Sequence, residues 1–125
     1  MKAAIFICAV LVSACDGRAT KTEVPGLYRT AYAGMTDVLN IGAEGTYEHT
    51  VQQDRTTVLH EKGTWMWETE GVDDNDRVSF DRYTCMVPGM QSSGLWPAIV
   101  EKHLWRVRLV LDEDVGLYYR QDRVP

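Results

Sequence analysis

Cysteine is the residue type whose spacing in this chain makes the clearest chemical prediction. Cysteines occur at positions 8, 15 and 85, and Cys15 ends a short apolar segment. Lys2 supplies a positive charge, residues 3–12 are apolar, and Ser13 and Ala14 are small. This order of charge, apolar core and small residues is typical of a secretory signal peptide. Cys15 would then lie at the cut site, with its thiol available for modification.

The tetrapeptide Val12-Ser13-Ala14-Cys15 resembles the lipobox of bacterial lipoproteins. In that family a diacylglyceryl group is attached to the cysteine thiol, the peptide is cut before it, and the new amino terminus is acylated. The resemblance implies that residues 1–14 are a signal peptide and that Cys15 is a lipid anchor on a periplasm-facing membrane surface. Asp16 follows, and in enterobacterial lipoproteins an aspartate there favours the inner membrane, with the outer membrane as the alternative.

Two other interpretations compete with the lipobox. A transmembrane helix needs about 20 apolar residues, and the apolar run here stops at Cys15-Asp16-Gly17-Arg18. It is too short to span a bilayer. Cleavage after Ala19, with Gly17 as the other small residue, would instead release a soluble secreted domain.

The remaining thiol and the hydroxyl groups offer no catalytic pattern. Cys8 leaves with the signal and Cys15 is taken up by lipid, so Cys85 has no partner for an intramolecular disulfide. No base or cation near Cys85 would activate its thiol, and a buried packing role is expected. Ser79, Ser92 and Ser93 lack a G-x-S-x-G context. We therefore expect no enzymatic activity.

Histidines 49, 60 and 103 are the candidate metal ligands of this chain. His49 and His60 lie on successive predicted strands, and the register between these strands decides whether the two meet. A three-residue loop pairs Glu48 with Lys62, His49 with Glu61, Val51 with Leu59, and Tyr47 with Gly63. It brings opposite charges together, whereas a two-residue loop opposes Glu48 and Glu61. The favoured register separates the histidines, so we expect exposed strand histidines and no metal.

Acidic turns do not indicate calcium, and we expect no cofactor. Asp73-Asp74-Asn75-Asp76 lacks the glycine and the glutamate of a calcium-binding loop. Asp112-Glu113-Asp114 is typical of a solvated hairpin turn. Loss of Lys2 leaves 12 basic against 18 acidic residues, a formal net charge of −6. This charge disfavours nucleic acid as a partner.

The chain after the signal predicts one all-β domain. Residues 15–24 form a polar tether, and residues 25–125 contain short runs rich in β-branched and aromatic residues, separated by Gly and Asp clusters. The predicted strands are 26–33, 37–42, 45–52, 57–62, 63–69, 77–84, 96–102, 104–111 and 117–121.

Alternation within these strands predicts the core. One side of each pleat carries the apolar residues, which points to an antiparallel sheet curled into a barrel. The residues assigned to that side are Tyr47, Val51, Trp65, Trp67, Val78, Phe80, Trp105, Val107, Leu109 and Leu111.

Three short motifs strengthen the barrel prediction. Gly26-Leu27-Tyr28, Glu44-Gly45-Thr46-Tyr47 and Gly63-Thr64-Trp65 together resemble the lipocalin-like meander of small bacterial envelope lipoproteins. The resemblance covers about residues 26–69 and implies a fold, a small antiparallel meander or lipocalin-like barrel. It implies no shared activity, so function has to be argued from a site.

One segment departs from strand alternation and is a candidate for binding. Residues 88–96 are rich in Gly and Ser and carry Met90, Leu95 and Trp96. Loops of this kind at a barrel mouth often contact a ligand or a partner. The sequence therefore predicts an anchored envelope module that binds a protein partner through Met90, Leu95 and Trp96. The alternative is a carrier of a small apolar ligand, which requires an open barrel interior.

Overall fold

The computed structural model describes residues 18–69 and 75–122. A short 3-10 helix, η1 (Lys21–Glu23), precedes eight strands in the described part of the chain. The strands are β1 (Gly26–Tyr32), β2 (Met35–Ile41), β3 (Thr46–Gln53), β4 (Thr56–Glu68), β5 (Arg77–Cys85), β6 (Ser92–His103), β7 (Arg106–Asp112) and β8 (Leu117–Gln121).

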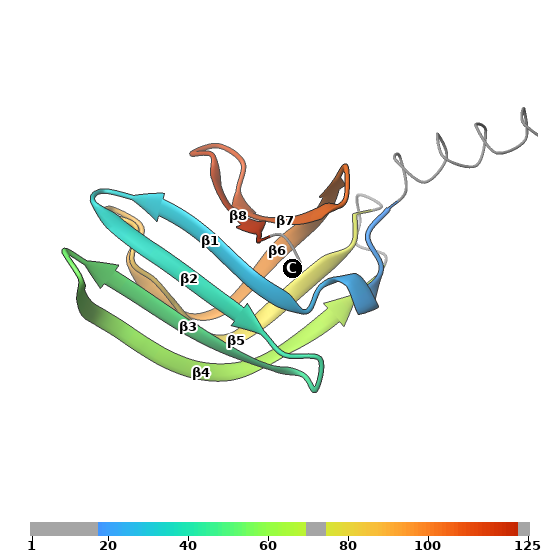
Figure 1. The fold of residues 1–125 in the computed structure, drawn as a ribbon, viewed down its shortest axis with the longest axis horizontal. Coiled ribbons are helices and arrows are strands. Elements are labelled where there is room, and N and C mark those ends of the chain that lie inside the picture. The colour runs from blue at the N-terminus through green and yellow to red at the C-terminus, as the bar shows by residue number, and fades with distance from the viewer. Residues whose placement is uncertain (1–17, 70–74, 123–125) are drawn as a thin grey trace, which may run out of the picture.

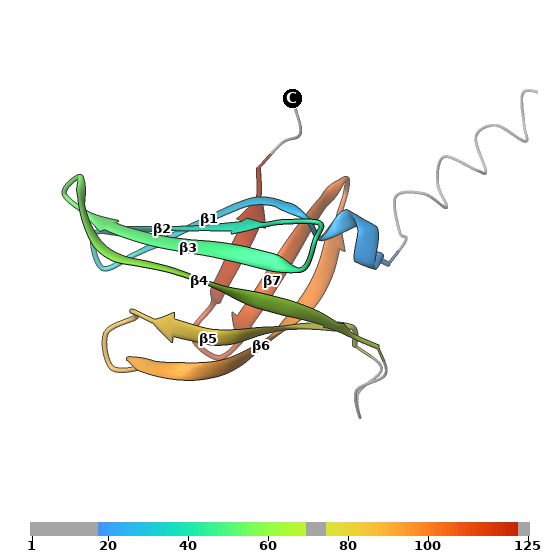
Figure 2. The same cartoon turned by 90° about the horizontal axis from the view of Figure 1, so that it is seen from below.

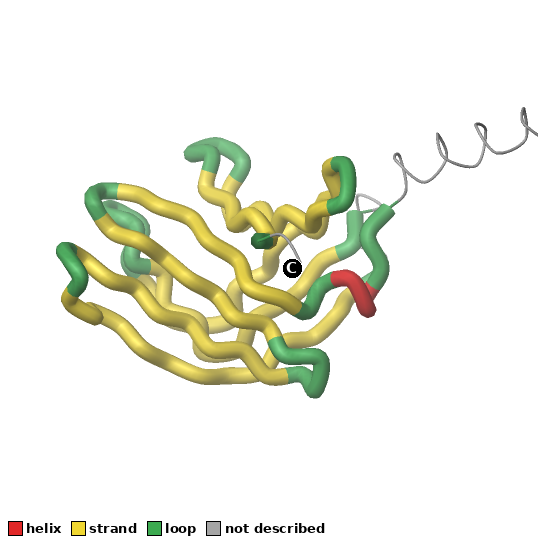
Figure 3. The backbone as a smooth tube through the Cα atoms, in the orientation of Figure 1, coloured by secondary structure: helices red, strands yellow, loops and turns green. Residues whose placement is uncertain are grey.

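The eight strands form a closed antiparallel barrel in which each strand pairs with the next along the chain (Figure 1). β1 closes the barrel against β8 through only two residue pairs, Tyr28 with Gln121 and Arg29 with Arg120. The tube view shows that strands make up most of the described chain (Figure 3). The predicted all-β fold, a small antiparallel meander barrel, is confirmed.

Period-two alternation explains why these segments form half-buried strands. In β2 the buried residues are Met35, Asp37, Leu39 and Ile41, and those between them are more exposed. β3 shows the same period. Because successive side chains of a strand point to opposite faces, every second residue enters the barrel.

Three predicted strand boundaries are wrong. Segments 57–62 and 63–69 are one long strand, β4, because Gly63 continues the ladder opposite Tyr47 rather than ending it. β6 begins at Ser92 instead of 96, so half of the predicted 88–96 loop is strand. β7 begins at Arg106 instead of 104, because Leu104 and Trp105 form the turn.

The predicted register between β3 and β4 is confirmed. Tyr47 pairs with Gly63, and His49 pairs with Glu61. The predicted three-residue loop is wrong, because Asp54 and Arg55 alone form the turn, both with positive φ. A two-residue turn of that kind matches the twist of the strands. A register shift after Val51, with Val58 as the extra residue, restores the predicted pairing.

Gly63 is required where β4 passes Tyr47. A Cβ atom on Gly63 would lie 2.7 Å from the Asp81 carbonyl oxygen and 2.7 Å from the Tyr47 ring. The Tyr47 hydroxyl donates a hydrogen bond to the same carbonyl, at 2.5 Å. The aromatic ring over this glycine therefore links β3 to β5 across β4.

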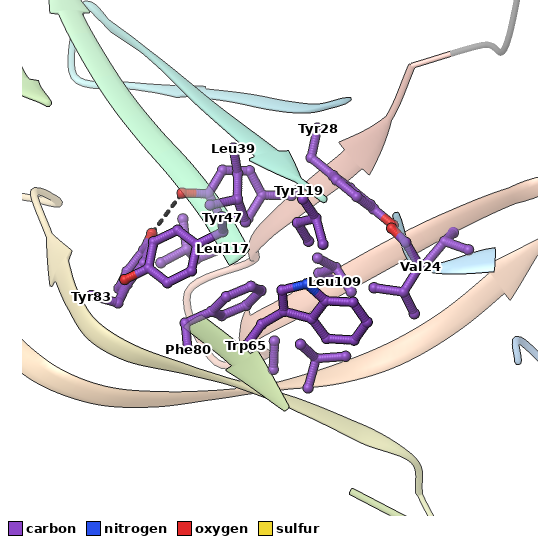
Figure 4. Packing of buried hydrophobic residues seen from close by; sticks show 14 of the residues in the cluster. Val24, Tyr28, Leu39, Tyr47, Trp65, Phe80, Tyr83, Leu109, Leu117 and Tyr119 are labelled. Atoms are coloured by element: carbon purple, nitrogen blue, oxygen red, sulfur yellow. Dashed lines mark hydrogen bonds between the residues drawn. The ribbon is translucent and has the colours of Figure 1, made fainter. Parts of the chain in front are cut away.

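Aromatic side chains fill the barrel. The largest buried ones, several of which Figure 4 shows in close packing, are Tyr28, Tyr47, Trp65, Phe80, Tyr83 and Tyr119. The predictions for Tyr47, Val51, Trp65, Val78, Phe80, Val107 and Leu109 are confirmed. Trp67 and Leu111 pack against the core while partly buried. The prediction for Trp105 is wrong: it is 75% exposed, because strand alternation does not extend into a turn.

The segment before β1 closes one end of the barrel. Val24 is fully buried, and its carbonyl oxygen accepts a hydrogen bond from the Tyr28 hydroxyl at 2.6 Å. Gln121 donates from Nε2 to the Glu23 and Pro25 carbonyls, at 3.0 and 3.2 Å. We call residues 19–25 the plug and this end of the barrel the plug end. The β5–β6 loop lies at the opposite end (Figure 2).

Candidate functional site

Charged and polar side chains meet inside the barrel at the end opposite the plug. Asp37 on β2 and His49 on β3 are buried, with 1% and 0% exposure. The His49 Nε2 atom lies 2.8 Å from Asp37 Oδ1, and its Nδ1 atom lies 2.8 Å from Glu61 Oε2. One imidazole ring is thus held between two carboxyl groups. We call these residues, with the tyrosines that bind them, the interior network.

Three tyrosines complete the interior network. Tyr119 donates its hydroxyl proton to Asp37 Oδ1 at 2.6 Å. The Tyr83 and Tyr119 hydroxyls lie 2.6 Å apart, joined by the dashed line in Figure 4. Since the Tyr119 proton is already used, Tyr83 is the donor in that bond. Tyr32 donates to the other Asp37 oxygen. Asp37 therefore accepts from His49 and from two tyrosines.

Glu61 is held on the opposite side of the ring. Its carboxyl oxygens accept hydrogen bonds from the Thr84 backbone amide and hydroxyl, both at 2.8 Å. The Tyr83 ring stacks on His49 with centroids 4.5 Å apart and planes 15° apart. The two carboxyl groups therefore hold the edges of the His49 ring, and the Tyr83 ring packs against its face.

The surroundings of His49 favour the imidazolium form. Burial alone lowers its pKa, but hydrogen bonds and charge attraction from Asp37 and Glu61 outweigh burial and raise the pKa above 6.5. Burial also raises the pKa of Tyr83 and of Tyr119 well above 10, so both hydroxyls stay protonated donors. The ring nitrogens of His49 and the carboxyl groups of Asp37 and Glu61 satisfy one another directly.

This arrangement is suited to holding the barrel together and poorly suited to catalysis. Both nitrogens of His49 are engaged and the ring is inaccessible, so a substrate cannot reach a free lone pair. Among residues 18–69 and 75–122, no group of three His, Cys, Asp or Glu side chains is placed to hold a metal ion. The interior network is therefore best explained as a structural feature that ties β2, β3, β4, β5 and β8 together.

The interpretation of His49 as an exposed strand histidine is wrong. His49 lies on the same face of β3 as Tyr47 and Val51, because every second side chain of a strand points the same way. Tyr47 and Val51 were both predicted to lie in the core, so His49 points inward with them. His60, also expected to be exposed, is exposed. The sequence patterns did not predict the interior network. The position of residue 49 between residues 47 and 51 on one face of the strand was nevertheless a sign that His49 is buried.

The structure separates the three residues of the predicted binding segment. Met90 and Trp96 pack against the hydrophobic core, and the Trp96 ring lies 5.8 Å from the Tyr83 ring. Leu95 points outward and is 67% exposed. Leu95 lies opposite a β-bulge in β5, between the Phe80–Trp96 and Tyr83–Gly94 pairs. The binding role of Met90, Leu95 and Trp96 stays a prediction, and of the three only Leu95 is largely exposed, since Met90 and Trp96 are partly buried.

The two cysteines of interest differ in what the structure says about them. Cys85 is a free, buried cysteine, as predicted, and burial raises the pKa of its thiol. A protonated thiol of that kind is a poor nucleophile. Cys15, the predicted lipid anchor, lies outside the described residues.

A second surface feature lies at the turn between β6 and β7. We call residues 103–106 the hairpin tip. Leu104 is 53% exposed and Trp105 is 75% exposed, in a two-residue turn where Leu104 has a φ of 58°. Turns with positive φ at their first central residue normally take glycine. A groove of about 1090 Å³ beside the hairpin tip is lined also by Arg108 and Arg120.

Comparisons with known proteins add no family to this description. No family model matches the chain, and no curated protein or solved structure matches it. Within the part of the chain that the structure describes, no helix is long and apolar enough to cross a membrane.

Proposed function

We propose that this chain is a lipid-anchored envelope protein that binds a partner through the outer surface of a filled barrel. The filled interior is the observation that carries this proposal. Buried aromatic rings occupy the middle of the barrel, the plug closes one end, and the interior network lies toward the other. We therefore place the binding site on the outside, where Leu95 and the hairpin tip are exposed.

The same observation weighs against the alternative, carriage of a small apolar ligand. An apolar carrier needs an interior space lined by apolar side chains. The groove beside the hairpin tip and a smaller cavity beside Tyr47 are both open to solvent, and neither is lined by Trp65, Phe80 or Tyr83. A ligand inside the barrel would have to displace close-packed rings.

The anchor is supported by the residues at the start of the chain. Val12-Ser13-Ala14-Cys15 has the order of small residues and cysteine that lipidation requires in the lipobox family. Two or more acyl chains at Cys15 would hold the domain stably at a bilayer, since one chain alone binds only marginally. Asp16 favours the periplasmic face of the inner membrane.

Leu95 is the best-placed residue of the predicted segment for contact with a partner. We would incorporate a photoreactive amino acid at position 95 in the full chain, irradiate intact cells and look for covalent protein adducts. Met66 is the matched control, because it is 62% exposed and also points outward from a strand. The expected result is a discrete adduct from position 95 and none from position 66. Equal yields, or none from either position, would contradict a binding surface around Leu95.

The anchor and the carrier alternative are tested on the same full-length chain. Palmitate labelling of the chain should be lost in Cys15→Ser, and persistent labelling would show that Cys15 is not the acceptor.

Titration with a fluorescent fatty acid should give no saturable binding with one site per barrel. Saturable binding that is lost on replacing Phe80 by Trp, with the fold retained, would favour the carrier instead.

A further inference from the structure

The hairpin tip and the start of the described chain lie at the same end of the barrel. In both Figure 1 and Figure 2 the β6–β7 turn lies on the same side of the barrel as η1. Lys102, one residue before the hairpin tip, forms an ion pair with Glu23 of the plug at 2.7 Å. The described chain begins at Arg18, just before the plug. The hairpin tip therefore lies beside the place where the amino-terminal segment joins the barrel.

The stability of the folded barrel does not explain why Leu and Trp occupy the hairpin tip. Leu104 has a positive φ, which a residue with a Cβ adopts at a steric cost. Leu104 and Trp105 are also left in solvent at a turn where Gly, Asn or Asp is usual. Strain and exposed apolar surface at one point indicate a contact made outside this chain.

The charges around the hairpin tip identify the kind of surface it fits. Arg106 follows Trp105 directly, and its side chain has no ion-pair or hydrogen-bond partner within residues 18–69 and 75–122. The acidic groups in and beside the groove are already engaged. Asp122 binds Arg29 at 2.9 Å, and Glu101 binds Arg108 at 2.9 Å. In a chain of net negative charge, this leaves local positive charge next to Trp and Leu.

That combination is the one found at the boundary between a bilayer and water. Tryptophan favours the headgroup level because its ring is apolar and its N–H is polar, and Arg binds phosphate. Cys15 lies only three residues before Arg18, and three residues span at most about 11 Å. If Cys15 carries lipid, the plug end is held within that reach of the headgroups.

We propose that the hairpin tip, Leu104 and Trp105 flanked by His103 and Arg106, docks into the phospholipid headgroup layer beside the lipid anchor. This inference rests on the proposed lipidation of Cys15. It fixes the orientation of the barrel, with the plug end toward the membrane and the end with the β5–β6 loop toward the periplasm. The barrel is thus held at two points instead of turning freely on its tether.

The test uses the full-length lipidated chain in vesicles of phosphatidylethanolamine and phosphatidylglycerol, with and without lipids brominated in the acyl chains. Bromine quenches nearby tryptophan fluorescence. Trp105→Phe should remove more than half of the bromine-dependent quenching. The control, Trp96→Phe, alters a partly buried tryptophan that packs on Tyr83 and should remove less than a tenth. Far-UV circular dichroism would verify that both variants are folded.

Lipid attachment is measured by mass in the same samples, so the two ideas can fail separately. A lipidated chain whose quenching is unchanged in Trp105→Phe would overturn the docked hairpin tip and leave the anchor intact. A chain without lipid would overturn the anchor and, with it, this inference. A photoreactive residue at position 105 in cells should couple to phospholipid. A protein adduct there would assign the hairpin tip to a protein and overturn the membrane contact.

Discussion

The two ends of the barrel interior are stabilised in different ways. At the plug end, polar atoms of core side chains bind the backbone: the Tyr28 hydroxyl donates to the Val24 carbonyl, and Trp65 Nε1 donates to the Gly42 carbonyl at 2.8 Å. At the other end, His49 and Asp37 bind each other, and Asp37 also accepts from Tyr119, which lies two strands away on β8. One end depends on packing around aromatic rings, and the other on hydrogen bonds between polar side chains.

This difference teaches where the barrel is tolerant of substitution. A backbone carbonyl cannot be removed by mutation, so changes at the plug end mainly create cavities. In the interior network each group satisfies another, so loss of one leaves a buried partner unsatisfied. The network also joins residues far apart in the chain, since Asp37 and Tyr119 are 82 residues apart. It therefore stabilises the closed barrel in addition to the two pairs between β1 and β8.

The largest effect is expected from a cavity at the plug end. Trp65→Ala should lower the free energy of unfolding by about 3–5 kcal/mol, because truncation of a buried tryptophan leaves a large void. Trp105→Ala is the matched control in the exposed hairpin tip and should change it by less than about 0.5 kcal/mol. Urea unfolding of both variants measures this. Similar losses in the two would contradict the contrast between a buried and an exposed tryptophan.

The second effect concerns a charge in the interior network. Asp37→Asn keeps the shape of the side chain but removes the charge that faces His49. We expect a loss of about 2–4 kcal/mol, since a buried charged hydrogen bond is broken. Asp122→Asn removes a surface ion pair with Arg29 and should cost less than about 1 kcal/mol. Equal losses in urea unfolding would mean that the network contributes no more than a surface ion pair.

Sequence patterns predicted the parts of the fold that depend on neighbouring strands. Alternation identified most of the core, and cross-strand charge pairing selected the register that puts Tyr47 over Gly63. The three-residue loop that was predicted with this register is wrong. A two-residue turn at Asp54 and Arg55 and a bulge at Val58 give the same pairing, and cross-strand pairs alone do not distinguish the two solutions.

The interior network could not be predicted in the same way. Polarity alone suggested that His49 faces solvent, and its inward position becomes favourable only when Asp37 and Glu61 are known to meet it. The β3–β4 register alone brings Glu61 to His49, but Asp37 lies diagonally across β2. Tyr119 reaches Asp37 only because β8 closes the barrel against β1. The prediction for Trp105 is wrong for a different reason. Strand β7 begins at Arg106, and the alternation does not continue back into the turn before it. Position in a turn decided its exposure.

The smallest effect, and the most specific to the interior network, is a dependence of stability on pH. The folded state raises the pKa of His49 above 6.5, so folding favours its protonated form. This contribution is complete below pH 6.5 and is lost as the pH rises through the folded pKa. The free energy of unfolding should therefore decline above pH 6.5. Measurements should stop near pH 8.5, because Cys85 and the buried tyrosines have raised pKa values and add similar losses at higher pH.

A pair of histidine variants assigns this slope to one ring. His49→Gln should abolish the decline between pH 6.5 and about 8.5, because glutamine has no proton to lose in that range. His60→Gln should retain the decline, because His60 is exposed and its contact with Glu48, at 3.4 Å, lies at the surface. Unfolding in urea at several pH values measures both. If His49→Gln kept the decline and His60→Gln lost it, the pH dependence would arise at the outer surface of the barrel. The interior network would then not be what distinguishes the two ends of the barrel.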